Sequence, residues 1–504
     1  MFTKPFNGAP CMTKTLILVT PPQKGLLEGF STGLIALGNY VRQYGDGINV
    51  RFLDLGLIPT SAITKSVASE LRSTSGQVFF GITGTTASYQ GMLATASAVK
   101  ALAPDSVVIF GGHHAGPQDE VVFRHHTGLV DFIIRGEGEI ALLALIRNYP
   151  SIENVTNLSY LKEGRMERTP EAKWLGSDVL DRLKPSFDPD SLPSTPGKFD
   201  HVTYVSARGC PLKCAFCAVG DSGFRSKSIP AIIDDLRHIV QVMGKNRIAI
   251  EDNFFAHQPH RTLELCNAIA DLVQEVPFSW DCQTRLESMK RPDVVAAMAR
   301  ANCEAAYLGI EALDEEHLLY LAKTLRPEDY LRILEEIVIP QMMDVGIDAY
   351  INLQLGIPGE TNEHRTTTLR RLRRLGQIAK SHGRAVTVFP QLNVIYPGTP
   401  HFKAAVETGR FGTLGFDVFE SFTLWESQEE PILTYLGEHF AHGVGGIPIG
   451  ILDQKLLKSG TFRISEHGPY ILSTYLRQME AIDGIQVFKY GDYLVRDNMP
   501  ELVR

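Results

Sequence analysis

Strand-like apolar runs alternate with helix-length amphipathic segments along most of the chain, and this alternation limits the folds that it can adopt. In the first 150 residues the strand-like runs are 14–20, 48–55, 78–83, 107–110 and 132–134. Alternation of this kind is typical of a parallel sheet with helices on both faces. We therefore expect an α/β fold that begins with a doubly wound, Rossmann-like parallel sheet.

A second alternating series begins at residue 201. Its strand candidates are 201–207, 247–251, 278–282, 305–309, 348–355 and 385–391. Helix-period segments fill the gaps between them. Six βα units are fewer than the eight of a closed barrel, so the pattern predicts a partial (β/α)6 barrel.

Changes of composition suggest where the domains begin and end. Residues 177–197 are rich in Pro, Ser and Asp, which is typical of a connection between domains. We predict a sheet domain over residues 1–150, a linker over 151–195 and a barrel over 196–410. Residues 411–504 would form a small C-terminal α+β domain, which is a candidate to shape a substrate pocket.

Composition excludes several classes of protein. Hydrophobic residues make up 44% of the 504 positions and charged residues 21%, as in an ordinary globular protein. The net charge of −8 includes no basic block, which argues against nucleic acid as the main ligand. No apolar run approaches the ~20 residues that span a bilayer. The polar N-terminus does not fit a signal peptide, so we expect a cytoplasmic protein.

Three of the seven cysteines lie within eight positions, in the loop that follows the first barrel strand. Cys210, Cys214 and Cys217 could together hold one metal centre. Iron–sulfur clusters are usually bound by four thiolates, so a four-iron cluster on this loop would keep one iron open for another ligand. The alternatives are a zinc site and three buried thiols without metal, but the loop offers no obvious fourth zinc ligand.

The spacing CxxxCxxC, with Phe216 before the last cysteine, resembles the signature of the radical S-adenosylmethionine (SAM) superfamily. The resemblance implies a 4Fe-4S cluster on Cys210, Cys214 and Cys217, with SAM on the open iron. It also implies an external one-electron reductant of the flavodoxin or ferredoxin type. One electron from the cluster would cleave SAM to a 5′-deoxyadenosyl radical, which can attack an unactivated C–H bond.

Other positions that the superfamily uses for SAM fall at the carboxyl ends of the next strands, where barrel sites form. They are Glu251, Asp252, Asn253, Arg285, Glu287, Glu311 and Gly356. The resemblance implies that the first three hold the SAM ammonium and that the next three reach its carboxylate and ribose. The glycine would let adenine approach the backbone. The alternative for the polar residues is a surface turn or a helix cap.

The first 150 residues resemble the cobalamin-binding domain that precedes many radical SAM barrels. The resemblance assigns cofactor contacts to Thr83, Thr85, Gly111, Gly112, His114, Gly136 and Glu137. The DxHxxG motif, whose histidine ligates cobalt in some relatives, does not occur in the sequence. Bound cobalamin and a vestigial domain that binds nothing therefore both remain open, and a capping or solvent-facing role is the alternative for His114.

The combined resemblance implies a cobalamin-dependent methyltransferase that acts on an unactivated carbon of a small metabolite. One SAM would methylate cobalamin, and a second would supply the radical. The main alternative keeps the fold but performs oxidative cyclisation, ring rearrangement or dehydration. A cobalamin or redox sensor is a third hypothesis. A methylthiotransferase is disfavoured, because that group carries three further cysteines in its N-terminal domain and this chain has only Cys11 there.

Overall fold

The computed structural model describes residues 13–22, 32–56, 58–172, 174–183, 202–393, 395–409, 417, 420, 475 and 477–487. The chain divides into two compact units. Among the described residues, the first unit contains those up to 175 and the second contains 176–183 and those from 202 onward. Because Cys11 and most of 411–504 lie outside the described residues, the predicted C-terminal domain is described only in part.

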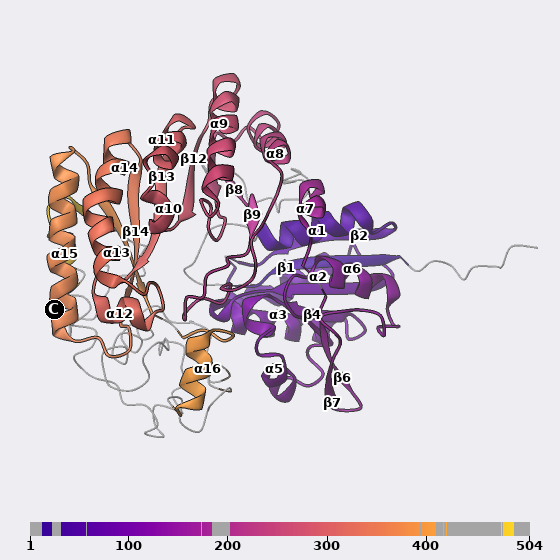
Figure 1. Ribbon diagram of the computed structural model, residues 1–504. Coiled ribbons are helices and arrows are strands. Elements are labelled where there is room, and N and C mark those ends of the chain that lie inside the picture. The colour runs from indigo at the N-terminus through magenta and orange to yellow at the C-terminus, as the bar shows by residue number, and fades with distance from the viewer. Residues whose placement is uncertain are drawn as a thin grey trace, which may run out of the picture. The chain divides into compact units, whose positions relative to one another are not determined.

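The first unit is built on a seven-stranded sheet with the order β2-β1-β3-β4-β5-β6-β7 (Figure 1). Its strands are β1 (Lys14–Thr20), β2 (Ile48–Asp54), β3 (Gln77–Thr83), β4 (Val107–Gly111), β5 (Phe132–Ile134), β6 (Leu158–Lys162) and β7 (Arg165–Arg168). β1 to β5 pair in parallel, which confirms the expected parallel sheet. The order reverses between β1 and β3, and open α/β sheets bind ligands at such a point.

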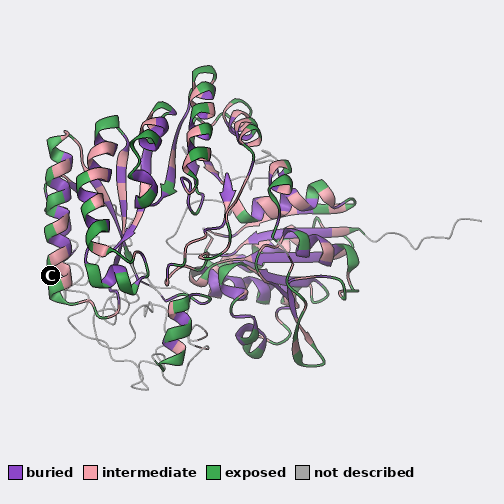
Figure 2. Ribbon diagram, viewed as in Figure 1, coloured by how far each residue is buried: buried purple, intermediate pink, exposed green. Residues whose placement is uncertain are grey.

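Helices cover both faces of this sheet. They are α1 (Thr32–Tyr44), η1 (Thr60–Ala62), α2 (Ile63–Leu71), η2 (Thr86–Ser88), α3 (Tyr89–Leu102), α4 (Gly112–Ala115), α5 (Asp119–His125) and α6 (Glu139–Asn148). Strand β1 shows why two layers are needed. Ile17 and Val19 belong to one buried cluster while Leu16 and Leu18 belong to another, because successive side chains point to opposite faces. The sheet is therefore buried on both sides (Figure 2).

The sheet continues past residue 150, where the sequence predicts a linker. β5 pairs antiparallel with β6, and β6 pairs antiparallel with β7. Glu163 (φ 51°) and Gly164 (φ 76°) form the tight turn between them, and positive φ at both central positions is typical of a β-hairpin. The buried carboxylate of Asp119 accepts hydrogen bonds from Ser159 Oγ (2.5 Å) and from Arg168 Nε (2.8 Å), which fixes the hairpin to α5.

The second unit contains another seven-stranded sheet, with the order β16-β15-β14-β13-β12-β11-β8 (Figure 1). Its strands are β8 (Val202–Tyr204), β11 (Arg247–Ile250), β12 (Ser279–Thr284), β13 (Cys303–Glu311), β14 (Asp348–Leu355), β15 (Val386–Leu392) and β16 (Ile485–Val487). All neighbours pair in parallel. Six strands lie at the predicted places and follow one another in chain order. β16 is a correction, because residues assigned to a separate C-terminal domain extend the same sheet.

Helices connect the strands of the second unit. They are α7 (Ser177–Arg182), α8 (Ile229–Gln241), α9 (Pro259–Glu275), α10 (Leu286–Met289), α11 (Pro292–Arg300), α12 (Glu315–Tyr320), α13 (Pro327–Ile333), η3 (Leu334–Val338), α14 (Ile339–Val345), α15 (Asn362–Ser381) and α16 (Pro400–Glu407). A short antiparallel pair, β9 (Ala207–Arg208) and β10 (Arg225–Ser226), brackets the cysteine loop. No helix of the described residues is both long and apolar enough to cross a membrane.

Candidate functional site

The cysteine loop is closed at its base by glycine and serine. Gly209 has a φ of 82°, and a Cβ atom on it would lie 1.8 Å from the carbonyl oxygen of Gly223, so a side chain cannot be accommodated there. The amide of Cys210 donates to Ser222 Oγ at 3.1 Å, and the amide of Ser222 donates to the Cys210 carbonyl at 3.1 Å. The loop therefore starts and ends at one fixed point.

The three thiols of the loop lie close enough to affect one another. Cys210 and Cys214 are buried, whereas Cys217 and Phe216 are half-buried. Burial and, to a smaller degree, the neighbouring Cys214 and Cys210 raise the pKa of Cys217. Three thiolates gathered in one partly buried place are an unfavourable arrangement unless cations compensate them. The donor set and its surroundings fit an iron–sulfur cluster.

Arg285 joins the loop to the end of β12. Its Nη1 donates to Cys214 Sγ at 3.1 Å, and its Nε and Nη2 donate to the Glu287 carboxylate at 3.1 and 2.9 Å. Nη2 also donates to the Lys323 carbonyl at 2.9 Å. Burial disfavours the charged form of Arg285, but the bonds to Glu287 outweigh it and raise its pKa. The structure thus brings Arg285, and Glu287 through it, to one cysteine of the loop.

Two further segments hold the middle of the loop. The amide of Ala215 donates to the Leu321 carbonyl at 3.0 Å, just after α12. The amide of His401 donates to the Ala215 carbonyl at 3.0 Å, and Thr399 caps α16 by accepting from the Phe402 amide. The cysteine loop is therefore positioned by backbone contacts from two distant parts of the unit.

The three polar residues that follow β11 lie in two different environments. They are Glu251, Asp252 and Asn253. Asp252 is fully buried, and it accepts hydrogen bonds from the amides of Ser206 (2.6 Å) and Ala207 (2.8 Å) and from Ser206 Oγ (2.5 Å). Burial raises its pKa to about 6 against these bonds. Asp252 thus positions the segment that leads into the cysteine loop, whereas Glu251 and Asn253 are exposed. Both carboxylate oxygens of Asp252 therefore bind Ser206 and Ala207, whereas the sequence predicts that they bind SAM.

A buried polar chain crosses the carboxyl ends of β13, β14 and β15. Glu311 accepts from Gln354 Nε2 at 2.9 Å, and Gln354 accepts from Asn393 Nδ2 at 2.5 Å. Lys323 Nζ lies 3.6 Å from the Glu311 carboxylate. Glu311 has a φ of 75°, an uncommon conformation for a residue other than glycine, and such backbone strain is concentrated at functional sites. Sequence reasoning found Glu311 but not its three partners.

The glycine-rich turn after β14 is closed by one of its own carboxylates. Gly356 has a φ of 67°, and its amide donates to Glu360 Oε2 at 3.2 Å. Arg365 Nη1 lies 3.4 Å from the same carboxylate oxygen. The turn therefore has a defined shape beside the polar chain, as a backbone-lined adenine site requires.

In the first unit, the ends of β3 and β4 form a tight glycine edge. Thr83 pairs with Gly111 across the two strands. Gly112 has a φ of 93°, and a Cβ on it would lie 2.4 Å from the Gly84 carbonyl oxygen and 2.7 Å from Thr83 Oγ1. Thr85 is exposed just beyond this edge. The bare backbone and hydroxyl groups here fit a polar cofactor tail.

His114 does not point toward solvent. It is 1% exposed, its Nδ1 lies 3.1 Å from Thr86 Oγ1, and its ring centroid lies 4.0 Å from that of Tyr89. Burial lowers its pKa to about 3, so the imidazole is neutral. His114 therefore packs inside the unit, which is neither the capping role nor the solvent-facing role that is the alternative to cofactor contact, while the adjacent His113 is exposed.

The loop after β5 carries the last two predicted cofactor residues. Gly136 has a φ of 70°, and a Cβ on it would meet open space. Glu137 lies in the same loop, and its Oε2 accepts from the Leu175 amide at 3.1 Å. Gly136 therefore offers backbone at an open edge, whereas Glu137 has a partner within its own unit.

Family comparison agrees with this division of the chain. A model of the B12 binding domain matches residues 26–146, and a model of the radical SAM superfamily matches residues 204–372. The chain has a B12-binding domain followed by a radical SAM domain. The cysteine loop and the residues around it belong to the radical SAM domain, and the glycine edge belongs to the B12-binding domain. Cobalamin, SAM and a 4Fe-4S cluster are the cofactors of these domains.

Two curated relatives illustrate the range of chemistry in similar chains. The chain is 27% identical to the hopanoid C-3 methylase of Methylococcus capsulatus over 231 residues, which are 44% of this chain and 43% of that protein. It is 21% identical to the anaerobic magnesium-protoporphyrin IX monomethyl ester cyclase of Synechocystis over 328 residues, 60% of this chain and 62% of that protein. The chain thus matches less than two thirds of each relative's length.

Solved structures share the fold of both domains. The radical SAM methyltransferase TsrM from Kitasatospora setae, determined with cobalamin and a 4Fe-4S cluster, superposes with a TM-score of 0.62 at 14% identity. That match covers 80% of this chain and 76% of TsrM. The cobalamin-dependent SAM radical enzyme OxsB gives a TM-score of 0.59 at 15% identity, covering 79% of this chain and 61% of OxsB.

Proposed function

We propose that this protein is a cobalamin-dependent radical SAM enzyme that methylates an unactivated carbon of a small molecule. The observation that carries the proposal is the partly buried three-thiol loop, braced by Arg285, in a chain that also has a B12-binding domain. The similarity to a hopanoid C-3 methylase and the shared fold with TsrM support methylation as the outcome.

We assign the cluster and SAM to separate groups of residues in the radical SAM domain. Cys210, Cys214 and Cys217 would hold the cluster, and Arg285 would stabilise the charge on the Cys214 sulfur. The Gly356 turn and the polar chain through Glu311 would orient SAM beside the open iron. When bound, the cluster, SAM and cobalamin supply radical initiation and a transferable methyl group.

The glycine edge would seat the polar tail of cobalamin. Gly111 and Gly136 would present bare backbone to the cofactor, because a Cβ on either meets no close neighbour, whereas Gly112 keeps the chain close to Gly84. Thr83 and Thr85 would add hydroxyl groups. Glu251 and Asn253, the two exposed residues after β11, remain candidates to bind the SAM ammonium. Glu287 would act mainly through Arg285.

The second candidate function is oxidative cyclisation. The similarity to magnesium-protoporphyrin IX monomethyl ester cyclases favours it. The match to the Synechocystis cyclase covers 60% of this chain. Both candidates need a one-electron donor, for which we propose a flavodoxin or ferredoxin. Cluster chemistry of this kind fits a reducing compartment, and a cytoplasmic location remains a prediction.

Cofactor loading followed by product analysis tests the proposal. The protein is purified anaerobically, its cluster is reconstituted, hydroxocobalamin is supplied, and iron and corrinoid are quantified. We expect ~4 iron atoms and close to one cobalamin per chain. With SAM, a chemical reductant and candidate acceptors, methyl transfer forms S-adenosylhomocysteine alongside 5′-deoxyadenosine. Iron without cobalamin would refute the methyltransferase and favour cyclisation or dehydration.

A further inference from the structure

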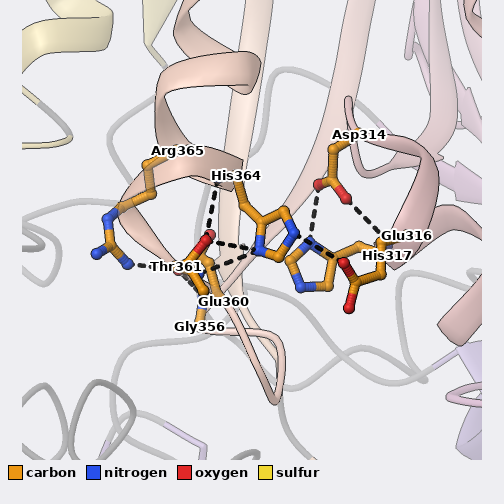
Figure 3. Close-up of polar contacts among 8 residues, drawn as sticks. All are labelled: Asp314, Glu316, His317, Gly356, Glu360, Thr361, His364 and Arg365. Atoms are coloured by element: carbon orange, nitrogen blue, oxygen red, sulfur yellow. Dashed lines mark hydrogen bonds and ion pairs between the residues drawn. The ribbon is translucent and has the colours of Figure 1, made fainter.

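Four side chains at the N-terminal ends of α12 and α15 converge (Figure 3). Asp314 caps α12, Glu316 and His317 lie in its first turn, and His364 lies in the first turn of α15. One possible ligand atom from each of Asp314, His317 and His364 lies within 4.8 Å of the others. Glu316 Oε2 lies 3.1 Å from His364 Nε2. Two imidazoles and two carboxylates therefore face one another between the two helix starts.

Local structure orients each of these groups. Asp314 caps α12 by accepting from the His317 amide at 2.9 Å, and its second oxygen lies 2.8 Å from His317 Nδ1. Thr361 lies against His364 Nδ1, with its amide nitrogen and its Oγ1 both 3.1 Å away. When the ring carries its proton on Nδ1 and donates it to Oγ1, the Nε2 lone pair is directed toward Glu316. The ring centroids of His317 and His364 are 4.4 Å apart. Contacts at the two helix caps therefore orient the side chains of Asp314 and His364.

One ring nitrogen of this group lacks a partner. His317 is 3% exposed, and its Nε2 makes no hydrogen bond to any described residue. A buried polar atom without a partner destabilises the fold unless a ligand satisfies it. Nδ1 already faces a carboxylate, and a carboxylate–imidazole pair is the arrangement by which proteins orient a histidine that binds a metal.

The two carboxylates of this group, on Asp314 and Glu316, have no permanently charged cation beside them among the described residues. Within the described residues, Asp314 and Glu316 form ion pairs only with the two histidines, and neither pairs with a lysine or an arginine. A divalent cation between the two helices would compensate both carboxylates.

We propose that His317 Nε2 and His364, with Glu316 as the third donor and Asp314 as the carboxylate that orients His317, form a binding site for one Zn²⁺ ion. Two imidazoles and one carboxylate, with water in the fourth position, form a donor set that suits zinc. The ion would join the start of α12 to the first turn of α15. Because Leu321, just beyond α12, holds the backbone of the cysteine loop, we infer a structural role for the ion.

The test is zinc binding by the loaded holoenzyme, which leaves the cluster cysteines occupied by iron. The protein is freed of loosely bound zinc, dialysed against low-micromolar ZnCl₂ and analysed for zinc and iron by mass spectrometry. We expect about one zinc per chain and a higher midpoint of thermal unfolding. The variants H364Q and D314N should bind zinc at least ~10-fold more weakly at unchanged iron content. Asn caps a helix as well as Asp does, so D314N should keep the α12 cap.

H260A is the matched control. His260 is an exposed histidine on α9 that pairs with Glu264. The variant H260A should therefore bind as much zinc as the wild type. Equal zinc content in wild type, H364Q and D314N would overturn the proposal, as would a wild type that takes up no zinc. Because the readout is metal content, it is independent of whether the enzyme transfers methyl groups.

Discussion

At the scale of single residues, Arg285 donates a hydrogen bond to Cys214, which we propose as a ligand of the cluster. A hydrogen bond to a ligating sulfur stabilises the more negative, reduced cluster. We expect R285M to shift the cluster potential to a more negative value, as measured by a redox titration followed by electron paramagnetic resonance. R291M is the control, because it is the same substitution at an arginine that pairs with Asp293 and not with a cysteine of the loop. An unchanged potential in R285M would show that this contact has no electronic role.

Asp252 should give the stability of the protein a measurable pH dependence. Burial raises the pKa of Asp252 from its usual 3.8 to about 6, so the folded chain holds this proton more tightly than the unfolded chain. Unfolding therefore releases a proton between about pH 4 and 6, and the free energy of unfolding falls as pH rises through that window.

The variant D252N removes this titration and keeps the shape of the side chain. Wild-type stability should fall more steeply than that of D252N, by up to ~1.4 kcal/mol per pH unit, in urea unfolding between pH 4.5 and 6. Asp281, whose pKa burial also raises to about 6, contributes equally to both proteins. Parallel pH profiles would contradict the assignment.

At the scale of elements, the Asp119 carboxylate fixes the β6–β7 hairpin to the rest of its sheet. D119A would leave the hydroxyl of Ser159, which is fully buried, without its acceptor. We expect a loss of about 2 kcal/mol in the free energy of unfolding. E120A is the control, because the Glu120 side chain is exposed and lies 3.9 Å from Arg168. Equal stability of both variants would mean that Asp119 does not anchor the hairpin.

The sequence predicts elements well where burial alone determines them. β1, β3 and β14 are continuous apolar or alternating runs, so their positions follow from the pattern. The β6–β7 hairpin was missed because its strands are short and carry charges, and its anchor, Asp119, is distant in sequence. In the same way, Glu311 is visible in a motif, but Lys323, Gln354 and Asn393 become its partners only when the parallel strands align.

At the scale of the whole molecule, each unit has its own sheet, so their cofactors should load independently. A triple C210A/C214A/C217A variant should lose essentially all its iron and keep the corrinoid content of the wild type. C266A is the control, because Cys266 is a fully buried thiol on α9, outside the cysteine loop. Loss of corrinoid from the triple variant would show that cobalamin binding depends on the cluster.

The pairing of β16 with β15 has a consequence for how the protein is made. β15 is complete long before residues 485–487 leave the ribosome, so during synthesis the side of β15 away from β14 offers free backbone donors and acceptors. Such an open side is a template for strands of other nascent chains. Until residues 485–487 are made, the polypeptide is therefore open to self-association at this side of β15, and we expect slow elongation before them to lower the yield of native protein without altering its final stability.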